Sequence, residues 1–530
     1  MTWVQYLGVG LLLLCVAVIS LRLLYPLPPL DPRSSSRHLS DTEDTPLGAG
    51  VAALRRGHPR LSGVHILTEG REAFAARVLL ARAATRTLDV QYYIWHPDLS
   101  GTLMLEAMLA AAERGVRVRM LLDDNGVAGL DGDLAALARH PNVEIRLFNP
   151  FVIRRPKALG YLADFGRLNR RMHNKSFTAD NQATIIGGRN IGDEYFAARD
   201  QGLFSDLDVL AVGPVVDEVS QDFDRYWASD SAYPAERILA AIPTAEPDAI
   251  HRRASLLERD PAARAYLEAV RALPFVEQIL AGSLPFEWSA IRMVSDDPAK
   301  GLGRAGDDKL LVHVLQDAVG TPTRELRLVS GYFVPTAAGV DVFGGLAREG
   351  RDVAIFTNAF EATDVWIVHA GYAHRRRALL EQGVRLFEMR GERASEGRRK
   401  LITTGSGSGS RGKDGPVLRS AGSTLHSKTF AVDRTRLFIG SFNFDPRSMH
   451  LNTELGFLID SPTMAAAVAR AFDDAIPMRA YEVVIGEDGH LRWIERGDVG
   501  RIVHEVEPGT TRWQRGGLWL LSKLPIEWLL

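Results

Sequence analysis

The sequence of 530 residues contains a single cysteine, Cys15, which lies in an apolar stretch near the N-terminus. One cysteine cannot form a disulfide bond within a chain, and a metal site of the cysteine type needs several thiolates. The sequence therefore excludes a fold held together by disulfide bonds and a zinc site built from cysteines.

An excess of charge of either sign is also missing. The 63 lysines and arginines nearly balance the 65 aspartates and glutamates, and the formal net charge is -2. Proteins that bind nucleic acid chiefly through its phosphates carry a strongly basic surface. The charge balance therefore disfavours a nucleic-acid partner, although a local basic groove would still be compatible with it.

The sequence has one long hydrophobic run. Residues 3–21 contain no charged side chain, and a helix of that length, at about 1.5 Å per residue, nearly matches a hydrocarbon core of about 30 Å. We expect an uncleaved membrane anchor. A cleaved signal peptide is the alternative, but no Lys or Arg precedes the run and no small-residue cleavage site follows it. Arg22, Arg33 and Arg37 follow the run, so the positive-inside rule places the body of the protein in the cytoplasm.

The most informative feature that is present is a pattern that occurs once in each half of the chain. A histidine is followed by a lysine and an aspartate at the same spacing, as His173, Lys175 and Asp180 and again as His426, Lys428 and Asp433. Each copy leads through an apolar stretch into glycine and then asparagine, as Gly187 and Asn190 and as Gly440, Ser441 and Asn443. Two copies in one register are far rarer by chance than one.

These residue types suit the transfer of a phosphoryl group. A phosphodiester is an anion, so a catalyst without a metal ion needs cations, an attacking group and a proton donor. A lysine about 4 Å from a phosphate oxygen attracts it by about 4 kcal/mol at an effective dielectric near 20. We expect Lys175 and Lys428 to supply this attraction, and Asn190 and Asn443 to donate amide hydrogen bonds to the same oxygens.

The local pattern alternates around each histidine, which places the histidine and the lysine on the same side of a strand. Asp180 and Asp433 then lie near strand ends. We interpret both aspartates as structural, because a carboxylate beside a phosphate would repel it. Gly187, Gly440 and Ser441 are likewise expected to shape the backbone around the site.

The paired pattern resembles the phospholipase D superfamily, and in particular its bacterial cardiolipin synthase-like members. Residues 88–95 and 115–124 resemble the opening strands of that fold, and residues 326–335 and 353–358 repeat them. The alternation of strands and helices predicts an α/β fold. The resemblance implies two pseudo-symmetric lobes, each a mixed β-sheet flanked by helices, with one site at their junction. The apolar run adds an N-terminal membrane helix before them.

The resemblance also implies roles for the histidines. One attacks phosphorus and forms a phosphohistidine, while the other protonates the leaving alcohol and then deprotonates the acceptor. We expect His173 to be the nucleophile and His426 the general acid and base, although pseudo-symmetry leaves the reverse assignment open. Neither a metal ion nor another cofactor is expected.

Members of this family also carry a carboxylate after each asparagine that orients a motif histidine. Glu454 has the expected position in the second half. In the first half we expect Asp208, with Glu194 as the alternative. Gly188 stands where the second half has Ser441, so the first set lacks one hydroxyl group.

The resemblance implies an enzyme of a bacterial inner membrane that transfers a phosphatidyl group between phospholipids and forms cardiolipin from phosphatidylglycerol. Phosphatidylethanolamine is a further candidate substrate, and the need for an accessory protein is open. The alternatives are a phospholipase D that hydrolyses headgroups and a nucleic-acid phosphodiesterase. The membrane-suited ends of the chain and its near-neutral charge favour lipid, and no nucleic-acid partner is expected.

The sequence divides into six expected segments. They are an anchor or signal-like segment (1–25), a linker (26–50), a first lobe (51–234), a helical connector (235–290), a second lobe (291–505) and an amphipathic tail (506–530). The tail suits the lipid interface, and packing on the core of the protein itself is an equal alternative. Residues 391–420, rich in charge and then in glycine and serine, are expected to form a mobile loop.

Overall fold

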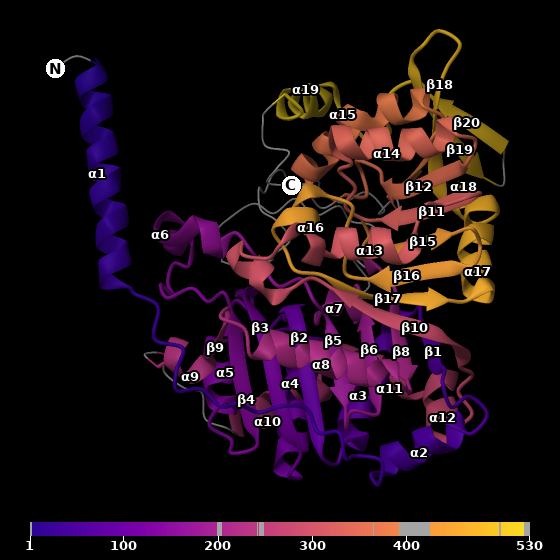
Figure 1. Cartoon of the computed structure of the whole chain (residues 1–530). Helices are drawn as coiled ribbons and strands as arrows, with labels where there is room; N and C mark the ends of the chain where they lie inside the picture. Colours follow the sequence, from indigo (N-terminus) through magenta and orange to yellow (C-terminus); the bar gives the residue numbers. More distant parts are fainter. Residues whose placement is uncertain are drawn as a thin grey trace.

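A computed structural model describes residues 3–198, 204–240, 242, 248–363, 365–391, 424–497 and 500–523. Two lobes are stacked on each other, and the N-terminal helix α1 (Trp3–Leu24) stands beside them (Figure 1). The loop expected at residues 391–420 and the last seven residues of the tail fall almost entirely outside the described residues.

The first lobe is a mixed sheet. Strands β2, β3 and β4 are parallel to each other, and the remaining pairs are antiparallel. In spatial order the strands are β1 (Ser62–Leu67), β8 (Asp208–Val212), β6 (Ala183–Gly187), β5 (Ser176–Ala179), β2 (Thr87–Ile94), β3 (Arg117–Gly126), β4 (Val143–Phe148) and β9 (Ala232–Pro234). The parallel strand β2 is buried along its whole length, as expected where helices cover both faces of a sheet.

Helices cover both faces of this sheet. Phe74 of α3 and Met104 of α4 share one core cluster with Val90, whereas Phe223 of α8 packs with Leu121 in another. The helices up to this lobe's end are α2 (Pro46–Arg55), α3 (Gly70–Ala83), α4 (Leu99–Glu113), α5 (Asp131–Leu137), α6 (Ala158–Leu168), α7 (Asp193–Phe196) and α8 (Val215–Trp227). The segment that follows contains α9 (Ala235–Ile238), α10 (Asp248–Arg259), α11 (Pro261–Arg271) and α12 (Pro274–Leu280).

The second lobe repeats the strand order of the first. The order is β10 (Glu287–Ser295), β17 (Leu455–Asp460), β16 (Arg436–Gly440), β15 (Lys428–Val432), β11 (Glu325–Ser330), β12 (Asp352–Asn358), β13 (Arg385–Met389), β18 (Ala480–Ile485), β19 (Leu491–Gly497) and β20 (Gly500–His504). Again the three strands β11, β12 and β13 are parallel. The predicted fold class of two pseudo-symmetric α/β lobes is therefore confirmed.

The remaining helical elements belong to the second lobe. They are the 3-10 turns η1 (Pro298–Leu302) and η2 (Asp307–Lys309), and helices α13 (Leu311–Val319), α14 (Thr336–Arg348), α15 (Trp366–Glu381), α16 (Pro446–His450), α17 (Pro462–Asp473), α18 (Ile476–Arg479) and α19 (Arg512–Leu521).

The lobes are joined by backbone pairing and by a common apolar core. Strands β1 and β10 pair with each other antiparallel, so the two sheets are continuous. Ile186 and Val209 of the first lobe are in the same buried cluster as Ile439 and Phe457 of the second. A short parallel pair, β7 (Phe204–Ser205) with β14 (Thr424–Leu425), makes a further connection.

The two ends of the chain contain the apolar surface that the sequence predicted. Helix α1 is long and apolar enough to cross a membrane, and a signal sequence would meet the same criteria. At the other end, Leu518 of α19 packs against Phe360 and Ala370, while Trp513 and Trp519 are exposed. The described part of the tail therefore packs on the second lobe and still presents tryptophans outward.

Candidate active site

The two histidine and lysine pairs lie at the starts of equivalent strands. His173 and Lys175 immediately precede β5, and Lys428 is the first residue of β15, two residues after His426. The Nζ atom of Lys175 donates to the carbonyl oxygen of His173 at 2.5 Å, and Lys428 makes the same contact with His426. All four side chains are buried.

Each histidine is held by the backbone of the opposite lobe. The amide of His173 donates to the carbonyl oxygen of Thr453 at 2.9 Å, and the amide of His426 donates to that of Ser205 at 2.8 Å. Each motif is thus fastened to the opposite lobe at its histidine, in addition to the strand pairing that it makes within its own lobe.

Glu454 contacts His173 as a carboxylate from the other lobe. The Nδ1 atom of His173 lies 2.8 Å from Oε2 of Glu454 and 3.1 Å from the carbonyl oxygen of Ser441. A carbonyl oxygen can only accept, so Nδ1 carries a hydrogen and the lone pair of the neutral ring is on Nε2. The hydroxyl of Ser441 also donates to Oε2 of Glu454, at 2.5 Å.

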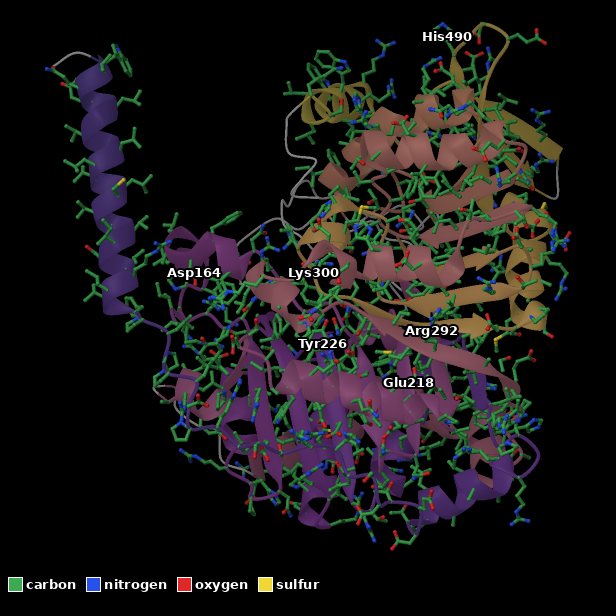
Figure 2. All side chains as sticks on the ribbon, viewed as in Figure 1. Asp164, Glu218, Tyr226, Arg292, Lys300 and His490 are labelled. Atoms are coloured by element: carbon green, nitrogen blue, oxygen red, sulfur yellow. The ribbon has the colours of Figure 1, made fainter. Side chains whose placement is uncertain are left out.

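Glu454 is supported by residues that the sequence analysis did not identify. Its amide donates to Oδ2 of Asp296 at 2.9 Å, and Nζ of Lys300 donates to the same oxygen at 2.9 Å. Tyr226 donates to the carbonyl oxygen of Asp296. Figure 2 shows Tyr226 and Lys300 in the region where the lobes meet. Asp296 and Tyr226 act through contacts between distant segments, whereas Lys300 binds Asp296 from four positions along the chain, and no local motif marks any of the three.

The carboxylate that contacts His426 is Asp206, not the predicted Asp208. Oδ2 of Asp206 lies 2.5 Å from Nδ1 of His426. Asp208 instead forms a buried ion pair with Arg77 at 2.9 Å and accepts from the amide of Arg189. Strand β7 pairs with β14 across the lobe junction, so Asp206, which directly follows β7, lies against the second lobe. Because this pairing joins distant segments, a comparison of the two halves along the sequence could not reveal it. The alternative, Glu194, lies 3.0 Å from Nδ1 of His96.

The departure at Gly188 has a steric explanation. A Cβ atom at this position would lie 2.1 Å from Oδ1 of Asp206, so the serine of the second half has no room in the first. Gly187 and Gly440 are constrained in the same way, because a Cβ atom on either would lie within 2.5 Å of the neighbouring strand or its side chains. The two halves therefore orient their histidines with different side chains. Glu454 contacts His173 together with Ser441, whereas the shorter Asp206 contacts His426 and lies against Gly188.

The two asparagines are not equivalent. Oδ1 of Asn190 accepts from the amide of Ile94, and its Nδ2 donates to the hydroxyl of Tyr195, whose ring lies 5.4 Å from that of His426. Asn443 is also buried, but its Oδ1 has no hydrogen-bond partner among the described residues. Both polar atoms of the Asn190 side chain are therefore already hydrogen-bonded within the first lobe.

The two motif aspartates bind backbone rather than the site. Asp180 accepts from the amides of residues 85, 86 and 87, at the start of β2. Asp433 accepts from the amides of residues 323, 324 and 325, at the start of β11. Both aspartates have positive φ angles, 48° and 54°, which short polar residues tolerate. Each one fastens the loop before a central parallel strand.

The charged groups of both lobes act on each other. Burial lowers the pKa of His173 well below its usual value, and Lys175 and Lys428 lower it further. Burial and Lys428 lower the pKa of His426 to about 4, against the opposing effect of Asp206. Burial lowers the pKa of Lys175 to about 7, with Glu454 opposing and Lys428 adding to the shift. The motifs therefore form one electrostatically coupled site at the junction of the lobes.

The two orienting carboxyl groups differ in charge. Burial raises the pKa of Glu454 to about 7, although Lys175 opposes this. The pKa of Asp206 is below its usual value, because His426 and Lys428 outweigh the effect of burial. Asp206 therefore loses its proton at a lower pH than Glu454, so the carboxyl group beside His426 is the one that is ionised near neutral pH.

One group of possible metal ligands lies outside these motifs. Ligand atoms of His96, Asp98 and Glu194 lie within 4.8 Å of one another. Asp98 caps α4 by accepting from the amide of Gly101, and His96 is paired with Glu194, so the three side chains have protein partners already. They are not part of the histidine and lysine site.

Comparisons with known proteins agree with this geometry. The model of the family described as cardiolipin synthase, PLD-like domain, matches residues 79–227 and 315–476, which make up more than half of the chain and include both motifs. The chain belongs to this family. The predicted resemblance to the phospholipase D superfamily and its cardiolipin synthase-like members is confirmed.

Individual members of the family cover nearly the whole chain. Cardiolipin synthase C of Escherichia coli (strain K12) is 46% identical over 91% of this chain and 99% of its own length. Cardiolipin synthase A of Klebsiella pneumoniae subsp. pneumoniae is 23% identical over 84% of this chain and 77% of its own. The crystal structure of a phosphatidylserine synthase from Haemophilus influenzae Rd KW20 covers 82% of this chain, with a TM-score of 0.52 and 14% identity, and shows the same fold.

Proposed function

We propose that the protein is a phospholipase D-type phosphatidyltransferase that forms cardiolipin from phosphatidylglycerol. The observation that carries this proposal is the single buried site with two complete histidine and lysine pairs. A binding protein without activity would not need both pairs intact. The relative at 46% identity is a cardiolipin synthase, and the membrane-suited helix α1 fits phospholipid substrates.

The first step is attack on a phospholipid by His173. Its Nε2 lone pair forms a bond to phosphorus as the bond to the headgroup oxygen breaks, and the product is a phosphatidyl-histidine. His426 gives its proton to the leaving oxygen, so glycerol departs when phosphatidylglycerol is the donor. Lys175 and Lys428 stabilise the charge on the non-bridging oxygens.

The second step reverses the proton transfer. The hydroxyl of a second phosphatidylglycerol attacks phosphorus as His426 removes its proton, and the bond between phosphorus and His173 breaks. Cardiolipin is released and both rings return to their starting states. Phosphatidylethanolamine would serve as a donor by the same steps, with ethanolamine as the leaving group.

The assignment of roles follows from the two carboxyl groups. A nucleophile must be neutral and a general acid must be protonated. His426 lies beside the ionised Asp206, which stabilises its imidazolium form when the anionic substrate is bound. His173 lies beside Glu454, whose raised pKa weakens that support. His173 is therefore the better nucleophile and His426 the better acid.

The enzyme is membrane-associated, and we place it at a bacterial inner membrane with its lobes in the cytoplasm. Arg22, Arg33 and Arg37 after the apolar run support this orientation.

The proposal is tested with purified protein and labelled phosphatidylglycerol. The wild type should produce cardiolipin and glycerol, and His173→Ala and His426→Ala should produce neither. Phosphatidic acid as the main product would indicate hydrolysis, and cleavage of DNA without action on lipid would contradict the proposal.

A second substrate separates the two roles. A phosphatidyl ester of nitrophenol has a leaving group that needs no acid, so His426→Ala should accumulate a labelled adduct on His173. His173→Ala should form no adduct. The opposite result would exchange the roles of the two histidines.

A further inference from the structure

Helix α6 lies where α1 meets the first lobe (Figure 1). The Nε atom of Arg22, in the last turn of α1, donates to the carbonyl oxygen of Ala163 in α6 at 2.6 Å. Figure 2 shows Asp164 of α6 near the same end of α1. Because Arg22 is the first charged residue after the apolar run, α6 lies at the level where α1 would leave the hydrocarbon core.

Helix α6 is kinked at Asp164, where the backbone leaves helical geometry, and it has some side chains packed on the protein and others exposed on both sides of the kink. Gly160 and Leu168 are buried, and a Cβ atom on Gly160 would lie 2.9 Å from the ring of Phe151. In contrast, Leu159, Leu162 and Phe165 are 39%, 53% and 47% exposed. Grouped apolar side chains on a surface indicate an interaction site, whereas single ones do not.

The helix is also connected to the active site. The ring of Tyr161 lies 5.2 Å from that of Phe151, and its hydroxyl donates to Asn125 at 3.3 Å. Gly126, the residue after Asn125, lies against Tyr93, since a Cβ atom on Gly126 would lie 1.8 Å from the carbonyl oxygen of Tyr93. The ring of Tyr93 in turn lies 5.0 Å from that of His173. The exposed apolar face is thus separated from the nucleophile by only a few side chains.

We propose that α6 lies in the interfacial region of the lipid bilayer, with Leu159, Leu162 and Phe165 among the acyl chains, and that phospholipid reaches His173 along this helix. Amphipathic helices bind bilayer surfaces by burying such a face. The exposed Arg155, just before the helix, suits anionic headgroups at the same level. A bilayer fits this face because α1, which contacts α6 through Arg22, is itself suited to the membrane.

This inference rests on the proposed function and extends it, since it names the surface through which the substrate enters. The exposed tryptophans of α19, on the second lobe, are a separate apolar surface. Both surfaces can be measured in one experiment, which reports the position of each helix without requiring activity.

The single cysteine makes the measurement direct. In a full-length Cys15→Ser background, Leu162→Cys is labelled with an environment-sensitive dye and reconstituted in vesicles of phosphatidylglycerol and phosphatidylethanolamine. Leu256→Cys on α10 is the control, because Leu256 is 62% exposed and α10 lies away from α6 in the first lobe (Figure 1). Trp519→Cys tests α19 in the same way.

The dye at position 162 should shift to the blue, and lipids with a quencher near the headgroup should quench it at least about twofold more than the control. Equal quenching at positions 162 and 256 would overturn the proposal. Strong quenching at position 519 with none at position 162 would assign the membrane surface to α19 instead.

A kinetic test separates membrane docking from damage to the site. Leu162→Glu should raise the KM for phosphatidylglycerol in vesicles by about tenfold, because a charged carboxylate replaces an apolar side chain that would lie among the acyl chains. Its kcat/KM for a dispersed short-chain phosphatidylglycerol should stay unchanged, and Leu256→Glu should change neither. If Leu162→Glu leaves the vesicle KM unchanged, the membrane position of α6 is wrong. If the wild type is inactive on every lipid, the proposed function is wrong, and the quenching experiment still tests the position of α6.

Discussion

Asp206 and Asp208 are two residues apart, both buried, and have different partners. Asp206 contacts His426, while Asp208 contacts Arg77. Asp206→Asn should leave the fold intact and lower kcat by about 10²- to 10⁴-fold, because the amide cannot stabilise the imidazolium of His426. Asp208→Asn should instead lower the free energy of unfolding by about 3–5 kcal/mol, since Arg77 loses its buried partner.

Steady-state kinetics and thermal unfolding of the two variants test this contrast. A folded Asp208→Asn variant with a large loss of kcat, together with a nearly active Asp206→Asn variant, would restore the assignment made from the sequence. The isosteric change keeps side-chain volume constant, so the comparison isolates charge.

Lys175 gives the site a pH dependence on the alkaline side. Burial lowers its pKa to about 7 in the free enzyme. The ammonium group is present below that pH and lost above it, so kcat/KM should fall as pH rises through about 7. In Lys175→Arg the guanidinium stays charged, and the fall should move to higher pH even though the maximal rate is lower.

The measurement is kcat/KM for a dispersed short-chain substrate between about pH 5.5 and about pH 9. If kcat/KM falls at the same pH in Lys175→Arg as in the wild type, another group, such as Glu454, causes the fall.

At the scale of the elements, each lobe depends on one loop fastened by a motif aspartate. Asp180 is fully buried, whereas Asp433 makes the same three backbone contacts in a partly exposed position. Replacing either by alanine removes these contacts at a similar positive φ angle. Asp180→Ala should lower the free energy of unfolding by about 3 kcal/mol or more, and Asp433→Ala by about 1 kcal/mol, because water can replace only the exposed carboxylate.

Denaturant unfolding of both variants checks this difference, and the shared backbone geometry makes each the control of the other. Equal losses of stability would mean that burial does not set the contribution of these contacts.

At the scale of the whole molecule, the site exists only when both lobes of one chain are in place. Each histidine is held by a carboxylate from the opposite lobe, and β1–β10 pairing joins the two sheets. A mixture of His173→Ala and His426→Ala proteins should therefore remain inactive, because no chain contains both histidines. The mixture is assayed for cardiolipin formation beside each variant mixed with wild type. Recovery of activity would show that chains exchange lobes.

The alternation of strands and helices was enough to predict the α/β class, and the duplicated motif predicted the family and the pairing of His173 with Lys175 and of His426 with Lys428. These features depend on residues close together in the chain, where alternation along a strand sets which side chains share a face. Glu454 was predicted through the family resemblance, since members carry a carboxylate shortly after the asparagine, and it directly precedes β17.

Asp206, Asp296 and the surface of α6 could not be obtained in that way. Asp206 and His426 are 220 positions apart and meet because β7 pairs with β14 across the lobe junction. Asp296 reaches Glu454 through a contact of similar range. Local alternation carries no information about such pairings, so the carboxylate beside each histidine is set by the packing of the two lobes.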